Sequence, residues 1–226
     1  MTEAIRFFRA VGLTDAMLAF GLATAVIVSG ATIVMNGGYT SGALAPIFLL
    51  QALASASGFL VPARRGYYDL LLTSSGDRIL IGITHWGISA APGIVCWVVL
   101  AGIEHALGGR ASMSLAPGTI VGMVLISTLP WAITVPLPRL TGGVAWLTIG
   151  ALVVSIAPGQ LLPSSAHDGF VARTLTILIC PWLLVGRELI GVDLAAATAA
   201  TVVSLAMFTS ALLWIDRADI PLEAAQ

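Results

Sequence analysis

The feature that most limits the fold of this chain is a series of long apolar runs. A membrane-spanning helix needs about 20 mostly apolar residues to cross about 30 Å of hydrocarbon. The sequence predicts six such spans, at residues 16–35, 43–62, 79–104, 117–137, 141–162 and 194–215. A further apolar stretch, 170–186, is shorter and contains Arg173 and Pro181. It is predicted to be re-entrant, dipping into the outer leaflet and returning.

The composition of the chain agrees with a lipid environment. Of its 226 residues, 58% are hydrophobic and 9% are charged, whereas soluble domains average about 25% charged residues. A chain this apolar cannot cover its own surface with polar groups. We therefore predict an all-α polytopic membrane protein, with residues 1–226 forming one transmembrane domain. Residues 2–14 have Ile5 and Phe8 on one face and charges on another, which predicts an amphipathic leader helix at the membrane surface.

The arginines indicate the orientation of the predicted spans, because cytosolic loops carry an excess of Lys and Arg. With six spans and the N-terminus inside, seven arginines lie in the cytosol and three outside. Counting 170–186 as a span would move Arg187 inside but Arg217 outside, so the tally would not improve. We predict a multi-pass protein of the cell (inner) membrane with both termini in the cytoplasm.

Several function classes are disfavoured by the residues present. The chain has no lysine, which excludes a Walker A phosphate loop and Schiff-base chemistry. It has no basic patch for nucleic acid. The three histidines do not place two imidazoles at a similar depth, and no carboxylate lies deep in a span. Cys96 and Cys180 both lie in apolar runs and are interpreted as small buried hydrophobic residues. We predict no catalytic residues, no metal and no cofactor.

The third predicted span contains the residues that could line a translocation path. His85 lies within it, and an ionisable residue inside a membrane is by default a functional candidate. Pro92 and Gly93 lie near its middle, where proline removes a backbone donor and usually kinks a helix. Each of these residues has an alternative interpretation. His85 would only bond to a backbone carbonyl, and the bend at Pro92 would only serve helix packing.

Residues 65–78 form a short island between the second and third predicted spans. Tyr67 to Ser74 can form a cytosolic helix of about two turns, in which Tyr67 is placed next to Leu71 and Tyr68 next to Leu72. Asp77 is then available to cap the third span. The alternative is an interfacial helix whose apolar face rests in lipid.

This island resembles a segment of type-2 ABC exporter permeases, which reads Gly-Thr-Leu-Glu-x-Leu-Leu-Thr-Ser-Pro-x-Ser-Arg. Gly66, the acidic Asp69, the Leu-Leu-Thr-Ser core at 71–74 and Arg78 fall in register with it. Tyr67-Tyr68 replaces Thr-Leu, Asp69 replaces Glu and Ser75 replaces Pro. The layout is also similar, with an amphipathic leader, six spans and a re-entrant segment before the last span.

The resemblance implies a transport subunit, not an enzyme, whose ATP is hydrolysed by a separate ATP-binding-cassette ATPase subunit. It implies a homodimer, or a heterodimer with a related permease, that exports a lipid-like, amphiphilic or peptide substrate. The coupling helix that docks on the ATPase would comprise Tyr67, Tyr68, Asp69, Leu70, Leu71, Leu72 and Thr73. His85-Trp86 followed by Pro92 also resembles the haem-exporter-type permease of cytochrome c maturation, which is one alternative. A non-transporting membrane anchor or sensor subunit is the other.

Overall fold

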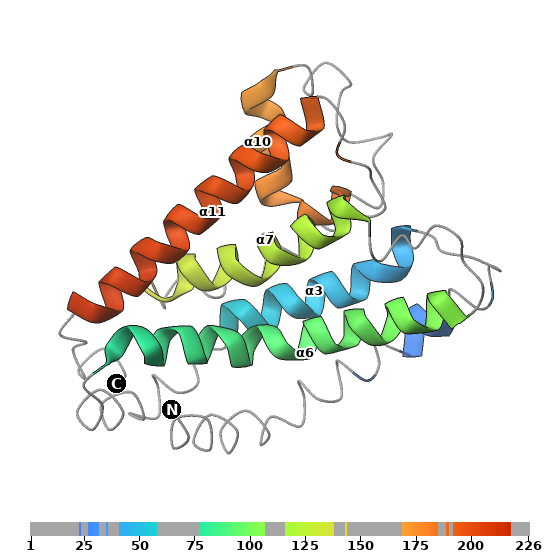
Figure 1. The fold of residues 1–226 in the computed structure, drawn as a ribbon, viewed down its shortest axis with the longest axis horizontal. Coiled ribbons are helices and arrows are strands. Elements are labelled where there is room, and N and C mark those ends of the chain that lie inside the picture. The colour runs from blue at the N-terminus through green and yellow to red at the C-terminus, as the bar shows by residue number, and fades with distance from the viewer. Residues whose placement is uncertain are drawn as a thin grey trace.

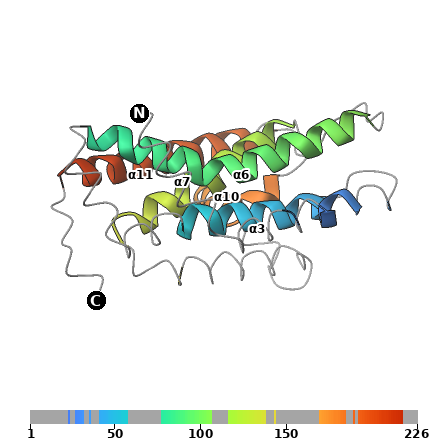
Figure 2. The same ribbon diagram turned by 90° about the horizontal axis from the view of Figure 1, so that it is seen from below.

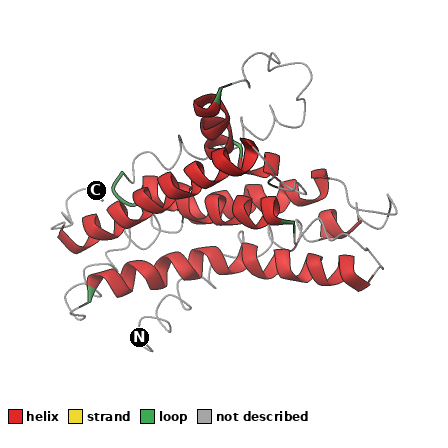
Figure 3. Cartoon of the chain, turned by 45° about the horizontal axis from the view of Figure 1, so that its top comes forward, coloured by secondary structure: helices red, strands yellow, loops and turns green. Residues whose placement is uncertain are grey.

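The fold is described from a computed structural model. It describes residues 23, 27–31, 35, 41–57, 77–106, 116–137, 143, 169–184, 189 and 192–217. Within these ranges every regular element is a helix (Figure 3). The prediction of an all-α protein is therefore confirmed for the part of the chain that the structure describes.

The described elements follow the chain in a simple order. They are α3 (Ser41–Ser57), α6 (Arg78–Ala106), α7 (Pro117–Thr134), α10 (Phe170–Ile179), the 3-10 turn η4 (Pro181–Leu184) and α11 (Val192–Arg217). Three of them, α6, α7 and α11, are long and apolar enough to cross a membrane. They coincide with the predicted spans 79–104, 117–137 and 194–215 to within three residues at each end. These helices are compatible with a membrane protein.

The remaining predictions are met only in part by the described residues. α3 covers most of the predicted span 43–62, and α10 with η4 covers most of the predicted re-entrant segment 170–186. The leader 2–14 lies outside the described residues, as do most of the predicted spans 16–35 and 141–162. The six-span count therefore stays a prediction.

Helix α7 is the centre of the described bundle. It contacts α3, α6, α10, η4 and α11, and it lies between α3 and α11 (Figure 1). α3, α7 and α11 run in one direction and α6 runs in the opposite direction, as the colours in Figures 1 and 2 show. The start of α6 and the ends of α3, α7 and α11 consequently lie at the same end of the bundle.

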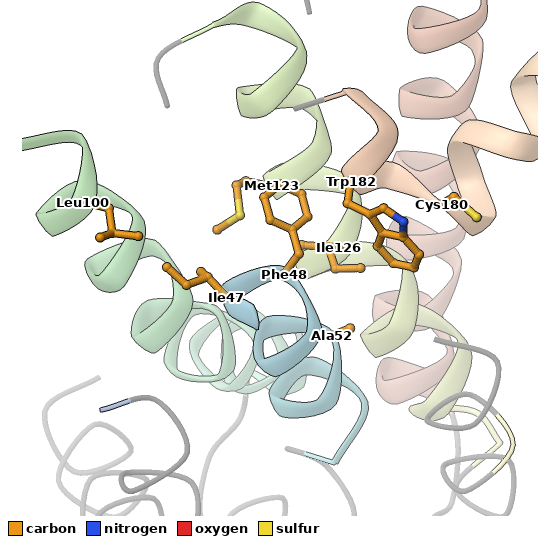
Figure 4. Packing of buried hydrophobic residues seen from close by; sticks show 8 residues of the cluster. All are labelled: Ile47, Phe48, Ala52, Leu100, Met123, Ile126, Cys180 and Trp182. Atoms are coloured by element: carbon orange, nitrogen blue, oxygen red, sulfur yellow. The ribbon is translucent and has the colours of Figure 1, made fainter. Parts of the chain in front are cut away.

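Three apolar clusters hold these helices together. One joins α3, α6, α7 and η4 and is drawn in Figure 4; its members are Ile47, Phe48, Ala52, Leu100, Met123, Ile126, Cys180 and Trp182. The second joins α6, α7 and α11 around Trp131 and Ile215. The third joins α7, α10, η4 and α11 around Leu125 and Ala200. Each cluster includes α7, which explains why this helix is the most buried of the three long ones.

The start of α6 follows a local rule that the sequence predicted. The Leu80 amide donates to Asp77 Oδ1 at 2.9 Å, which is the hydrogen bond of an N-cap to the third residue of its helix. The cap prediction for Asp77 is confirmed. One residue further on, Arg78 Nη1 donates to the Asp216 carbonyl at 3.4 Å and so ties the start of α6 to the end of α11.

Candidate functional site

The residues predicted to line a path, His85 and Gly93, lie on the inner side of α6. His85 is 3% exposed, and Gly93 is buried. His85 contacts α7, and Gly93 contacts α3. Pro92 lies inside α6, and the helix continues through it. Both His85 and Gly93 thus face other helices of the same chain.

The His85 imidazole is held by a tryptophan of α7. Trp131 Nε1 donates to His85 Nδ1 at 2.9 Å, and Trp131 is 0% exposed. An indole N–H can only donate, so Nδ1 must act as the acceptor and the neutral ring carries its proton on Nε2. This bond fixes the tautomer of His85 and engages Nδ1, which leaves that nitrogen unavailable to a metal or a haem iron.

Gln51 on α3 extends the polar contacts from His85 to a third helix. Its Nε2 donates to Ser55 Oγ at 3.0 Å and to the Ser89 carbonyl at 3.4 Å. Ser89 Oγ in turn donates to the His85 carbonyl at 3.0 Å. We call Gln51, Ser55, His85, Ser89 and Trp131 the polar seam. It joins α3, α6 and α7 in the interior of the bundle.

Gly93 permits the closest approach in this seam. A methyl group on Gly93 would overlap Gln51 Oε1 and would lie 2.6 Å from Gln51 Cδ. No real Cβ comes that close to a neighbouring atom, and the obstructing group is buried within the bundle. A side chain at position 93 would have to displace the Gln51 amide, so glycine allows Gln51 to lie in its observed place against α6.

Pro92 lies one turn after the carbonyl that Gln51 binds on α6. Proline has no backbone N–H, so the carbonyl four residues earlier, that of Ile88, receives no helical hydrogen bond from it. Freed backbone groups in a membrane helix are satisfied by neighbouring helices or by water. Gln51 binds the adjacent carbonyl, that of Ser89. The seam therefore meets α6 within one turn of Pro92, at a carbonyl next to the one that the proline leaves free.

Two more polar contacts hold α7 to its neighbours. Trp86 Nε1 donates to the Ser127 carbonyl at 3.0 Å, which adds a second link between α6 and α7. Thr128 Oγ1 and Ser204 Oγ lie 2.6 Å apart and link α7 to α11. Hydroxyl pairs of this kind are typical of contacts between membrane helices.

Sequence reasoning identified His85 and Gly93 but missed their partners. Gln51 is the only amide side chain in the predicted span 43–62, and a strongly polar residue inside an apolar run is a signal that could have singled it out. Trp131 carries no comparable signal, because tryptophan is common in apolar runs. Its pairing with His85 depends on how two helices pack.

The described residues offer little else for chemistry. Among them no group of three His, Cys, Asp or Glu side chains could hold a metal ion. Glu104 is buried near the end of α6 that is remote from Asp77. Cys96 and Cys180 are free thiols. The arrangement is thus suited to holding helices together, and the seam shows no constellation for covalent catalysis.

The predicted coupling helix, Tyr67 to Thr73, lies outside the described residues. Its two neighbours in the chain are described. α3 ends at Ser57 and α6 begins at Arg78. α3 runs toward the end of the bundle at which α6 begins and α11 ends (Figure 1). The island that carries the coupling-helix motif lies in the chain between these two helices.

The chain was compared with protein-family models, with curated proteins and with solved structures, and none of them matches it.

Proposed function

We propose that this chain is the membrane-spanning permease subunit of an ATP-driven exporter of the type-2 ABC kind. In this proposal a separate ATPase subunit binds the segment Tyr67 to Thr73, and two permease copies, or one copy and a related permease, form the path. The substrate is lipid-like, amphiphilic or a peptide. The protein lies in the cell membrane with both termini in the cytoplasm.

The observation that carries the proposal is the sequence of residues 66–78 together with the place where it joins the bundle. The Leu-Leu-Thr-Ser core and Arg78 match the coupling-helix segment of these permeases. The segment lies in the chain between α3 and α6, and the start of α6 that follows it is hydrogen-bonded to the end of α11. A short helix at that position would act on α3 and α6 directly when a partner moves it.

The directions of the helices support the predicted number of spans. α7 ends at the same end of the bundle at which α6 begins, while α10 and α11 begin at the opposite end (Figure 1). A crossing between them is what the predicted span 141–162 would supply. The alternation of α3, α6 and α7 is also what the second, third and fourth of six spans require.

The burial pattern supports a lipid environment for this proposed permease. α6 exposes large apolar side chains such as Val95 and Val98, at 59% and 58% exposure. α7 and α11 bury serine and threonine, as at Ser127, Thr128 and Ser204. Hydrocarbon-facing surfaces with small and polar residues between the helices are characteristic of membrane bundles.

The proposal also gives the buried seam a role different from lining the path. If the path lies between two permeases, His85 and Gly93 do not face it, because they face α7 and α3 of their own chain. They would influence transport by holding α6 in position. The surfaces available to line a path between two copies are the outward faces of the long helices.

The test is to replace Tyr68 and Leu71 with Asp in the full chain. We expect the variant to insert and fold as the native chain does, but to lose co-purification with the ATPase subunit and substrate-stimulated ATP hydrolysis. Burying two charges in an apolar docking surface is unfavourable. The matched control is Ala106→Asp, an exposed position at the opposite end of α6, which should leave both measurements unchanged.

Native ATPase stimulation in the double variant would refute the coupling-helix assignment. Failure of the native chain to associate with any ATP-binding-cassette subunit would refute the permease function.

A further inference from the structure

The contact between α3 and α6 at Gln51 and Gly93 is tight in space but incomplete in hydrogen bonds. Gln51 is 0% exposed, and its Oε1 has no hydrogen-bond partner within the part of the chain that the structure describes. Its Nε2 makes one bond of ordinary length, to Ser55, and one long bond of 3.4 Å, to the Ser89 carbonyl. A buried amide oxygen without a partner is unfavourable, because it loses its bond to water and gains none in return.

Close packing at the same place acts in the other direction. The side chain of Gln51 lies against the backbone of Gly93, where any Cβ would overlap it. The nearby cluster of Ile47, Phe48 and Leu100 also holds α3 and α6 together. Close packing favours contact between α3 and α6, while the incomplete polar contacts favour their separation. The two effects act in opposite directions at one place.

Pro92 lies next to Gly93 in α6. The helix lacks one backbone hydrogen bond there, and helices bend at such positions. Of the hydrogen bonds that Gln51 makes to described residues, separation of α3 from α6 would break only the long one to Ser89, in addition to the apolar contacts between the two helices. It would also give Gln51 Oε1 access to water.

We propose that Gln51, Gly93 and Pro92 form a latch between α3 and α6. The latch is closed in this structure and opens, with entry of water, when the helices part. This inference rests on the proposed function, because a permease has to move α3 and α6 relative to each other when its coupling helix is displaced. Gln51 is a positioning residue in this account, and it binds no substrate.

The latch predicts opposite effects for two substitutions. Gln51→Leu removes the incompletely bonded amide and keeps a side chain of similar size, so it should favour the closed arrangement. Gly93→Ala introduces the overlap with Gln51, so it should favour the open arrangement. Gly87→Ala is the matched control, because a Cβ on this second glycine of α6 would meet no other atom within 4 Å.

The native Cys96 can report opening, since it lies three positions after Gly93 and packs against the cluster that joins α3 and α6. The full chain carrying Cys180→Ala is placed in lipid nanodiscs without any partner, and the rate of Cys96 modification by a charged, water-soluble thiosulfonate is measured. We expect Gly93→Ala to raise the rate about tenfold, which corresponds to a shift of about 1.4 kcal/mol in the equilibrium. Gln51→Leu should lower the rate below that of the native chain, and Gly87→Ala should not change it.

Equal rates in the native chain and in Gln51→Leu would overturn the latch, as would a higher rate in Gln51→Leu. Equal rates of Cys96 modification in Gly93→Ala and in Gly87→Ala would also overturn the latch. Should Gly93→Ala fail to give monodisperse protein, the comparison of Gln51→Leu with the native chain decides alone. The measurement uses no ATPase, so failure of the latch leaves the co-purification test intact, and failure of co-purification leaves this test intact.

Discussion

Helices α7 and α11 can both cross a membrane by length and composition, yet they are buried to very different extents. In the most apolar 18-residue stretch of α7, 67% of the residues are buried, against 33% in α11. The stretch in α11 is nevertheless the more apolar of the two. Hydropathy therefore does not determine which of these helices occupies the centre of the bundle.

Small residues and hydrogen bonds contribute to the difference, together with large side chains. α7 buries Gly122 and Thr128 as well as Leu125 and Trp131. α11 contacts fewer elements: it buries Ala200 but exposes Leu205. In an aqueous bundle the large apolar side chains would face inward. In lipid the hydrocarbon tails solvate leucine as well as another helix does. Close packing and polar contacts therefore decide which residues lie between the helices.

The largest expected effect comes from placing a charge on the outward face of α11. Leu205 is 48% exposed and lies near the middle of the helix, so Leu205→Arg should destabilise the inserted state by about 2.5–3.5 kcal/mol. The control is Leu213→Arg, which is similarly exposed at 43% but lies one turn from Arg217 at the helix end. There the long side chain can reach the interface, and the cost should be smaller.

The measurement is the fraction of each variant that resists alkaline extraction from membranes, followed by its unfolding in mixed micelles. Equal behaviour of the two arginine variants would mean that the outward face of α11 does not lie in hydrocarbon. The contrast between α7 and α11 would then have to be explained without lipid.

The next largest effect should come from enlarging a glycine in the centre of α7. A Cβ on Gly122 would lie 2.8 Å from the Pro181 carbonyl oxygen and 3.0 Å from Phe48 Cε1. Gly122→Val should therefore lower the free energy of unfolding by about 1–3 kcal/mol through overpacking. Gly102→Val is the control, because Gly102 is an exposed helical glycine whose added Cβ would meet nothing within 4 Å. Thermal unfolding in detergent compares them, and equal loss in both variants would contradict the central role of close packing in α7.

The extent of the long helices could be predicted from the sequence because it depends on local features. A run of about 20 apolar residues is visible without knowledge of any partner, and α6, α7 and α11 follow such runs. The cap at Asp77 also depends only on a short stretch of chain, and a cap at this residue was predicted; the structure shows that it binds the Leu80 amide. A candidate role for His85 could be suggested because an imidazole is rare inside an apolar run.

The pairing of helices could not be predicted in the same way. α7 and α11 are apolar on all sides, so no periodic pattern indicates which face of either is buried. Gln51 contacts Gly93, which lies 42 positions away in the sequence. Trp131 binds His85, which lies 46 positions away. Such contacts depend on the relative rotation of two helices, which is set by many small packing terms at once.

The smallest expected effect comes from a comparison of two buried tryptophans, of which one donates a hydrogen bond. The comparison separates the contribution of the bond from that of side-chain size. Trp131 and Trp182 are both buried, at 0% and 7% exposure. Trp131 donates its N–H to His85 Nδ1, whereas Trp182 Nε1 has no hydrogen-bond partner among the described residues. Replacement of either by Phe removes the same volume and leaves a similar gap. Trp131→Phe additionally removes the donor to His85, so it should cost about 1 kcal/mol more than Trp182→Phe.

Reversible unfolding in mixed micelles measures the difference, and Trp182→Phe is the matched control. If the two losses were equal, α7 would be central through close packing alone and its bond to His85 would contribute nothing measurable. A larger loss in Trp131→Phe would show that polar contacts, as well as small residues, hold α7 at the centre while α11 stays at the edge.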